Sequence, residues 1–447
     1  MSFSAERVEL GRGANTVIIL PELRHLNGTP KRDRFARDEE AQGLALAIGV
    51  NIIGSFPITV RAPSSATLFG KGQVQLLAGQ LAAHDTQLVF VDAALTPIQQ
   101  RNLESAWQVK VIDRTGLILE IFGERAVTAE GRMQVELAHL DYQQSRLVRS
   151  WTHLERQRGG FGFLGGPGET QIEADRRLIR DRMAHIRRNL ENARRTRSLH
   201  RHRRQRAPWP VVALVGYTNS GKSTLFNYLS HSDVVAKDML FATLDPTMRQ
   251  IEVPSLGKVI LSDTVGFVSD LPTQLVAAFR ATLEEVSSAD LLLHVRDISH
   301  TDSEGQKADV MRVLAELGVG PEARAGAREG DTQQGTPTIV EIWNKIDRIN
   351  ADERQAVIAA AARVGAIALS ALTGEGTEQI AAILSELLGG QAVERRIHIA
   401  IGDGRVRAWL HENAKVIEEK LLMDGRLEML IQLSALNNGR LGNMLAN

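Results

Sequence analysis

The chain has 447 residues, of which 43% are hydrophobic and 24% are charged, with 53 Lys and Arg balanced by 53 Asp and Glu. This length suffices for about three domains of ordinary size, and the composition excludes a disordered or fibrous protein. The absence of cysteine excludes disulfides, thiolate metal sites and a cysteine nucleophile. No apolar run is long enough to cross a bilayer, and the first ten residues lack the blocks of a signal peptide. We therefore expect a cytoplasmic protein without integral membrane insertion, with membrane association as a second location.

Residues 1–126 alternate between strand-like and helix-like runs. Strands are expected at 16–23, 51–60, 87–95 and 109–115, and helices at 72–84 and 98–107. This alternation predicts an N-terminal parallel α/β domain. Lys71 lies between two glycines ahead of a helix, where backbone N–H groups and a cation could meet an anion. A plain strand-to-helix turn is the simpler interpretation of a lone glycine–lysine pair.

Residues 127–206 change to a helical period. Apolar residues recur every three or four positions on both sides of a glycine-rich break, which predicts a long antiparallel helical hairpin. The tip loop RGGFGFLGGPGETQ places Phe161 and Phe163 among its glycines. An exposed apolar cluster marks a contact surface, and an inert linker is the alternative.

The second helix of the hairpin is rich in arginine and contains no lysine. Its candidate contacts with a partner include Arg187, Arg188, Arg194 and Arg195. Guanidinium groups suit phosphate geometry, and so many like charges favour a polyanionic partner over a merely solvated face. RNA, DNA and anionic lipid all fit this charge.

A strand and a helix flank the sequence GYTNSGKST within residues 207–390, which we take as the phosphate loop of a nucleotide-binding domain. Its residues are Gly216, Tyr217, Thr218, Asn219, Ser220, Gly221, Lys222, Ser223 and Thr224. The glycines let the backbone wrap a phosphate, and N–H groups at the start of the helix point toward it. Lys222 is expected to reach the outer phosphates and Ser223 to ligate Mg²⁺.

A second motif, Asp263, Thr264, Val265 and Gly266, follows an apolar strand. Asp263 is placed to hold Mg²⁺ through water, and Gly266 leaves room for its N–H to reach the γ-phosphate. Loss of that phosphate would release residues 266–271, an order-to-disorder switch. Phe267 stands where many small GTPases place the glutamine that orients water, so we expect slow intrinsic hydrolysis.

Selection of the base is assigned to two further motifs. Asn344, Lys345 and Asp347 follow the strand TIVEIW, and Ser370, Ala371 and Leu372 follow the strand AIAL. The carboxylate of Asp347 can accept from guanine N1–H and the 2-amino group, whereas adenine offers neither donor. The four motifs in this order predict a GTPase that binds GTP and GDP.

The motifs resemble those of the HflX family of ribosome-associated GTPases, in the translation-factor-related class. The resemblance covers nearly the whole chain and includes VIDRTGLILEIFGERA, GGPGETQIEADRRLI, GYTNSGKSTLFN, DMLFATLDPTMR, DTVGFVSDLP and NKID. It implies binding to the large ribosomal subunit and its rRNA, and the splitting of stalled or stressed ribosomes. It also implies that Thr243 meets Mg²⁺ and the γ-phosphate, with Thr247 as the competing residue. Lys222, Thr243 and Gly266 are thus the expected catalytic residues.

Asn219 resembles the asparagine of potassium-activated GTPases, which makes K⁺ a second candidate ion beside Mg²⁺. A turn asparagine that only caps the loop is the alternative. Residues 391–447 predict a small C-terminal α/β module, with strands at 397–401 and 426–435 and a helix at 406–421. We expect the free protein to be monomeric. The rival functions are a nucleotide-dependent RNA remodeller that uses ATP through Lys71, and a membrane-recruited signalling GTPase whose arginines bind anionic lipid.

Overall fold

The computed structural model describes residues 12–23, 33–149, 171–205, 209–232, 240–241, 247–254, 256–270, 285–319, 337–389, 393–400, 402–422, 425–433, 438, 441–442 and 444–445. The chain forms two compact units. The first runs to Arg195 and also takes in Leu240, Phe241 and Val268–Asp270, and the second holds the other described residues. None of the described helices is long and apolar enough to span a membrane.

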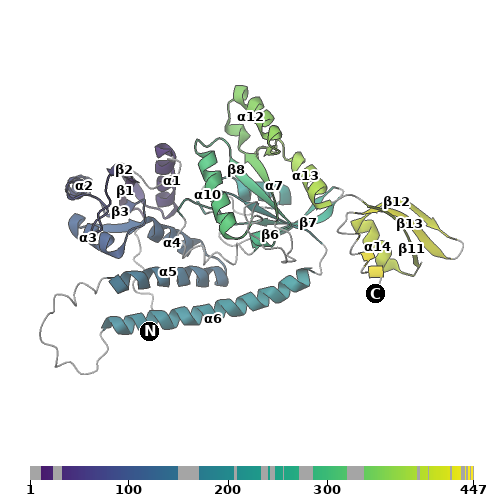
Figure 1. Ribbon diagram of the computed structural model, residues 1–447, viewed down its shortest axis with the longest axis horizontal. Coiled ribbons are helices and arrows are strands. Elements are labelled where there is room, and N and C mark those ends of the chain that lie inside the picture. The colour runs from purple at the N-terminus through teal and green to yellow at the C-terminus, as the bar shows by residue number, and fades with distance from the viewer. Residues whose placement is uncertain are drawn as a thin grey trace. The chain divides into compact units, whose positions relative to one another are not determined.

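The first unit contains a four-stranded parallel sheet in the order β2-β1-β3-β4 (Figure 1). Its strands are β1 (Asn15–Leu23), β2 (Asn51–Val60), β3 (Leu88–Val91) and β4 (Lys110–Asp113). Its helices are α1 (Arg34–Ala47), α2 (Lys71–Ala83), α3 (Pro97–Trp107) and α4 (Arg114–Arg125). The predicted parallel α/β fold is confirmed, because apolar strands bury side chains on both faces beneath helices.

Helix starts in this unit are fixed by their first residues. The Thr96 side chain accepts from the Gln99 N–H, and the Gln99 side-chain oxygen accepts from the Thr96 N–H. Asp113 ends β4 and caps α4 by accepting from the Gly116 N–H at 2.8 Å. Asp113 therefore places the next residue, Arg114, at the carboxyl edge of the sheet.

The two helices of the predicted hairpin are α5 (Ala129–Arg149) and α6 (Gln171–Gln205), which lie side by side (Figure 1). Arg182 of α6 donates to Glu136 of α5 at 2.7 Å. Met183 and Ile186 are the buried apolar positions of α6. The tip loop between the helices, with Phe161 and Phe163, lies outside the described residues.

The second unit contains a six-stranded sheet in the order β10-β9-β8-β5-β7-β6, parallel except for β6. Its strands are β5 (Val211–Val215), β6 (Thr247–Val253), β7 (Gly257–Asp263), β8 (Leu291–Asp297), β9 (Thr338–Asn344) and β10 (Ile367–Ala368). Its helical segments are α7 (Lys222–Ser230), α10 (Ser303–Glu316), the 3-10 turn Ile346–Arg348, α12 (Ala351–Arg363) and α13 (Glu378–Gly389). The strands bury a continuous aliphatic core, so the predicted P-loop domain fold is confirmed.

The C-terminal part forms a separate antiparallel sheet, β11-β13-β12, and includes the helix α14. Its elements are β11 (Val393–Ala400), α14 (Gly404–Asn413), β12 (Lys415–Leu421) and β13 (Arg426–Leu433). The expected helix at 406–421 is wrong in its second half. Val416 packs against the sheet's core and Ile417 points outward, so the β-branched pair alternates as in a strand. Gly425, at φ +80°, directly precedes the return strand β13.

Candidate guanine-nucleotide site

The phosphate loop joins the end of β5 to the start of α7. Gly216 and Gly221 have φ values of +152° and +92°. A Cβ on Gly216 would lie 2.1 Å from the Val295 carbonyl oxygen, so only glycine lets the loop turn this close to β8. Among the described residues, the buried hydroxyls of Thr218 and Ser220 have no hydrogen-bond partner. A polar lining of this kind, at the N-terminus of a helix, suits a bound phosphate.

Lys222 begins α7 and is buried at the centre of the loop. Its ammonium group donates to the Tyr217 carbonyl oxygen at 2.7 Å. Burial lowers the pKa of Lys222 to about 8, with Asp263 opposing the shift and Lys345 adding to it. A phosphate beside this amine would stabilise its charged form, because an opposite charge offsets the loss of water.

Ser223 and Asp263 bring the first two motifs together. The Ser223 hydroxyl donates to Asp263 Oδ2 at 2.7 Å. Mg²⁺ takes oxygen ligands, and this hydroxyl and carboxylate form a fitting pair at the edge of the phosphate loop. Within the described part of the chain no group of three or more His, Cys, Asp or Glu could hold a metal. A magnesium ion here would therefore depend on the nucleotide's phosphates for much of its coordination.

The backbone after Gly266 pairs with the phosphate loop. The Phe267 N–H donates to the Gly216 carbonyl at 3.1 Å, and the Phe267 carbonyl accepts from the Thr218 N–H at 2.6 Å. A Cβ on Gly266 would lie 2.8 Å from the Cα of Thr218 and 3.0 Å from the Lys222 ammonium nitrogen. The phosphate-sensing motif thus lies against the phosphate loop, and the buried Phe267 ring offers no polar group to a water molecule.

Asn344 ties the base-recognition motif to the phosphate loop. Its amide donates to the Ser220 carbonyl at 2.8 Å, and its oxygen accepts from the Ala371 N–H at 2.9 Å. The Ser370 hydroxyl donates to Asp347 Oδ1 at 2.5 Å, which orients that carboxylate. The structure therefore brings both predicted base-recognition motifs together beside the phosphate loop, while the Leu372 side chain is exposed.

Asp297 is a residue of this site that the sequence interpretation missed. It ends β8, and its carboxylate forms an ion pair with Lys345 at 2.7 Å. Lys345 lies at φ +66°, so the ion pair holds a residue in the left-handed region. The signal was available, because a carboxylate at the end of a parallel strand lies at the edge where such sheets bind ligands.

For several other predicted residues, the structure describes no contact within the nucleotide site. Thr243 lies outside the described residues, as do Phe161 and Phe163. Asn219 is exposed at φ +59° in the turn of the loop. Asparagine adopts the left-handed conformation more readily than most residues, so the turn alone accounts for its presence. Its role toward K⁺ stays a prediction.

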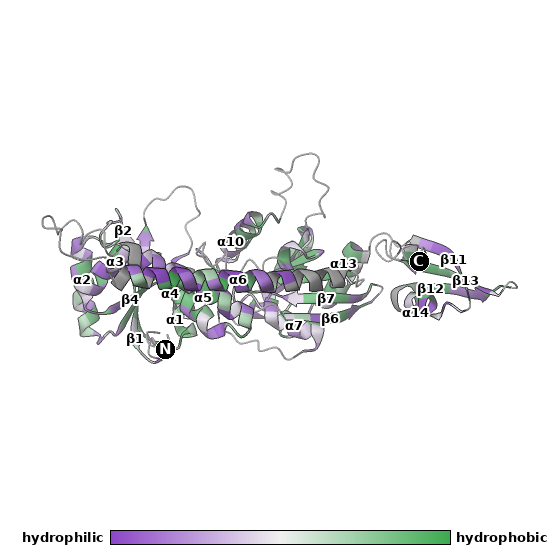
Figure 2. Ribbon diagram, turned by 90° about the horizontal axis from the view of Figure 1, so that it is seen from below, coloured by the Kyte–Doolittle hydropathy of each residue, from purple (hydrophilic) through white to green (hydrophobic). Residues whose placement is uncertain are grey.

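Most of the described residues of the arginine-rich helix α6 are hydrophilic (Figure 2). Arg187 and Arg188 are exposed, and Arg195 forms an exposed ion pair with Glu191 at 3.5 Å. The side chain of Arg194 is not among those described. The exposed arginines remain accessible to a polyanion, since surface ion pairs of this kind are weak.

The turn around Lys71 supplies its own capping groups. Gln73 accepts from the Gly70 N–H at 3.0 Å and donates to the Thr59 carbonyl at 2.9 Å. This arrangement favours the plain strand-to-helix turn over a second nucleotide site.

Comparison with known proteins finds relatives over most of the chain. Four family models match: "GTP-binding GTPase N-terminal" at 36–123, "GTP-binding GTPase Middle Region" at 125–204, "50S ribosome-binding GTPase" at 211–323 and "HflX C-terminal domain" at 356–447. GTPase HflX of Magnetococcus marinus is 50% identical over 380 residues, covering 85% of this chain and 84% of the relative. GTPase HflX of Escherichia coli is 40% identical over 410 residues, covering 90% and 91%. A GTP-binding protein from Sulfolobus solfataricus, solved in complex with GDP, is 21% identical with a TM-score of 0.42, covering 83% of this chain and 98% of that one. The expected family is confirmed, and the chain belongs to the HflX family of GTPases.

Proposed function

We propose that this GTPase uses its nucleotide state to control binding to the large ribosomal subunit, and that the cycle splits stalled or stressed ribosomes. One observation carries the nucleotide site: segments distant in sequence are joined by hydrogen bonds into a single constellation within one unit. These bonds are Ser223 to Asp263, Asn344 to Ser220, Ala371 to Asn344, and Ser370 to Asp347.

The phosphate end of this constellation supplies charge and positioning. Lys222 and the N–H groups at the start of α7 bind the phosphate oxygens and stabilise the charge that develops on them. The N–H of Gly266 reports the presence of the γ-phosphate. Ser223 and Thr243, with Asp263 through water, would hold Mg²⁺. When bound, that ion supplies neutralisation of the β- and γ-phosphates.

The base end selects guanine. Asp347, oriented by Ser370, accepts two hydrogen bonds from guanine, and adenine would leave the carboxylate without them. The turn at Ala371 is held by Asn344, so its backbone is positioned beside the base. We infer that GTP and GDP bind in preference to ATP and ADP.

Two features support a ribosomal partner. The model that matches residues 211–323 is described as a 50S ribosome-binding GTPase. The arginines of α6 supply a cationic surface that suits the phosphates and shape of rRNA. The glycine-rich tip with Phe161 and Phe163 is the proposed contact at the end of the hairpin.

The first experiment measures GTP hydrolysis with and without isolated large subunits, in parent and in a variant with alanine at 187, 188, 194 and 195. We expect stimulation by the subunit in the parent and its loss in the variant. Arg312→Ala, at an exposed arginine of α10, is the matched control and should retain stimulation. Sedimentation of intact ribosomes with the protein and a non-hydrolysable GTP analogue tests splitting directly. Hydrolysis that ignores the subunit would contradict the ribosomal assignment.

The choice of monovalent ion tests Asn219. We infer that K⁺ held near Asn219 accelerates hydrolysis relative to Na⁺. Equal rates in the two salts would leave the asparagine as a turn residue only.

A further inference from the structure

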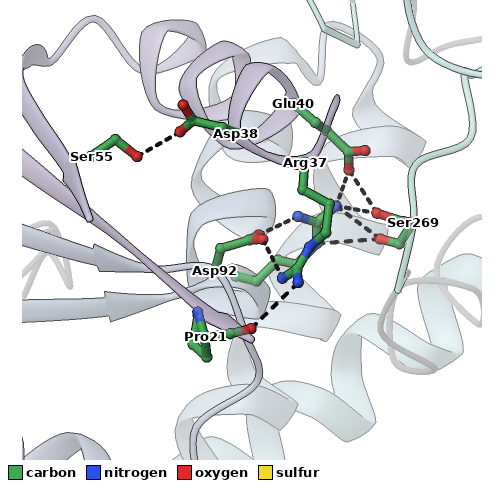
Figure 3. A network of polar contacts seen from close by, with 8 residues as sticks. Pro21, Arg37, Asp38, Glu40, Ser55, Asp92 and Ser269 are labelled. Carbon is green, nitrogen blue, oxygen red and sulfur yellow. Dashed lines mark hydrogen bonds and ion pairs between the residues drawn. The ribbon is translucent and has the colours of Figure 1, made fainter. Parts of the chain in front are cut away.

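A buried ionic cluster lies at the carboxyl edge of the parallel sheet of the first unit (Figure 3). Asp92 follows β3, Arg114 begins α4 after β4, and Glu40 lies in α1. Arg114 forms ion pairs with both carboxylates, and Arg37 donates to Asp92 at 3.1 Å. Charged groups at this depth persist only when their hydrogen bonds are satisfied.

Ser269 completes this cluster although it lies 155 residues from Arg114 in sequence. Its hydroxyl accepts from Arg114 at 2.8 Å and donates to Glu40 Oε1 at 2.8 Å, and its carbonyl accepts from Arg114 at 3.0 Å. Both hydrogen-bonding groups of Ser269 are thus held by charged side chains of the first unit. The carboxyl edge of a parallel sheet is where such folds bind ligands, and here it binds a segment of the same chain.

The place of Ser269 in the sequence gives this contact a consequence for the GTPase switch. Ser269 follows Gly266 by three residues and Phe267 by two. Three residues of extended chain span at most about 11 Å, so Gly266, the γ-phosphate sensor, can move only a short distance from Ser269. Phe267 is itself paired with Gly216 and Thr218. The sensor is therefore held on one side by the phosphate loop and on the other by Ser269.

A second contact joins the same unit to the segment that follows α7. The ring of Phe241 packs edge-on against Phe122 of α4, with centroids 4.5 Å apart, and both rings are buried. Leu240 lies against Gly43 of α1, close enough that a Cβ there would lie 3.1 Å from it. Phe241 precedes the switch residue Thr243 by two positions. The first unit thus holds residues adjoining both switch motifs.

We propose that the first unit is a built-in positioning device for the GTPase switch, and that Ser269 is the residue through which it acts. The Glu40–Asp92–Arg114 cluster fixes the backbone behind Gly266, so less ordering is needed when that backbone meets a γ-phosphate. GDP lacks the γ-phosphate and depends instead on the phosphate loop and the base motifs. This inference rests on the proposed nucleotide site and describes how the first unit regulates it.

The test compares Ser269→Ala and Glu40→Gln with the parent. Ser269→Ala removes the hydroxyl that bonds to both Arg114 and Glu40. Glu40→Gln keeps the side chain's shape but weakens its ion pair with Arg114 and its bond from Ser269. Ser55→Ala is the matched control, because Ser55 also donates to a carboxylate of α1, Asp38, at 2.5 Å but lies apart from Ser269 (Figure 3). Measurements are single-turnover GTP hydrolysis, the affinities for fluorescent GDP and for a non-hydrolysable GTP analogue, and thermal unfolding.

We expect about a three- to tenfold loss of hydrolysis and of analogue affinity in both variants, the size of one typical intramolecular hydrogen bond. GDP affinity should change less than twofold, and Ser55→Ala should match the parent. The loss in the double variant should be smaller than the product of the two single losses, because both changes act on the bond between Ser269 and Glu40. Parent-like variants, or an equal loss of GDP and analogue affinity, would overturn the positioning role and leave the proposed nucleotide site standing. A parent protein that binds neither nucleotide would overturn the proposed function, and this inference with it.

Discussion

The Ser223 hydroxyl donates to Asp263 Oδ2 across 2.7 Å, which joins the first turn of α7 to the end of β7. The two residues lie close together because β5 pairs with β7 in parallel and α7 directly follows β5. The sheet therefore holds together the hydroxyl and the carboxylate that we propose as part of the Mg²⁺ site.

Ser223→Ala should raise the Mg²⁺ concentration needed for half-maximal GTP hydrolysis by at least about tenfold, because a positioned oxygen ligand is lost. Titration of hydrolysis with Mg²⁺ measures the shift. Ser230→Ala is the control on the same helix, since the Ser230 hydroxyl makes local bonds, to the Phe226 carbonyl and to the Ser232 hydroxyl. An unchanged Mg²⁺ requirement in Ser223→Ala would remove this serine from the metal site.

Asp347→Asn should lower GDP affinity roughly 10- to 100-fold, because charge-assisted bonds to guanine are lost and the amide presents a donor to another donor. Xanthosine diphosphate, which carries an oxygen in place of the 2-amino group, should gain affinity. The Asn oxygen can still accept from Ser370, so the loop should stay folded. Equilibrium binding of both nucleotides checks this, with exposed Asp352→Asn as the control. Equal affinity of parent and variant for GDP would contradict the assignment of the base site.

The motif-bearing loops were predictable because each follows a strand whose apolar pattern is plain. Asp263 follows VILS and Asn344 follows TIVEIW, and both strands appear where expected. Local pattern fails for residues 415–421, whose apolar residues fit either a helix or an edge strand. The pairing of Lys415–Leu421 with β13 decides between them.

The contacts of Ser269 could not be inferred from sequence for a different reason. Its partners Glu40 and Arg114 come from α1 and α4, 229 and 155 residues away. A serine after DTVGFV carries no pattern that names such partners. The ion pair between Asp297 and Lys345 was easier to predict, because Asp297 ends β8 and Lys345 follows the adjacent parallel strand β9.

Because His294 is buried, we expect the free energy of unfolding to fall at acid pH. Burial in β8 lowers the pKa of His294 from 6.5 to about 4, with Glu341 opposing and Arg296, Lys307 and Lys222 adding to the shift. The unfolded chain therefore binds more protons between these values, so the stability from the neutral ring is complete above pH 6.5 and falls as pH drops toward 4. Lowering pH from 6.5 to 5 should cost about 2 kcal/mol through this group.

Urea unfolding of the parent and His294→Gln at the two pH values measures that cost as the difference between their pH dependences. His398→Gln, at an exposed histidine paired with Glu428, is the control and should keep the parent's dependence. Identical pH dependence in the parent and His294→Gln would show that His294 does not set acid stability.

Ribosome binding through α6 should depend on salt. Each phosphate contact releases counterions, so replacing Arg187 and Arg188 by alanine should reduce the slope of log affinity against log salt by up to about 2. Binding to isolated large subunits over a range of KCl concentrations gives the slope. The same measurement on Arg312→Ala should return the parent's slope, and a parent-like slope in the α6 variant would place the electrostatic contact elsewhere.

A side chain at Gly221 would strain the backbone and also displace Asn344, whereas one at Gly318 would only strain the backbone. Gly221 lies at φ +92°, and a Cβ there would be 2.1 Å from the Asn344 amide nitrogen. Gly221→Ala should therefore displace Asn344 from Ser220 and abolish measurable GDP binding. Gly318 lies at φ +75° with no atom within 4 Å of its Cβ position, so Gly318→Ala carries only the backbone cost of about 1–2 kcal/mol. Both variants should lose thermal stability, and only Gly221→Ala should lose GDP affinity. Retained GDP binding in Gly221→Ala would mean that the Asn344 bridge between the phosphate loop and the base motif is dispensable.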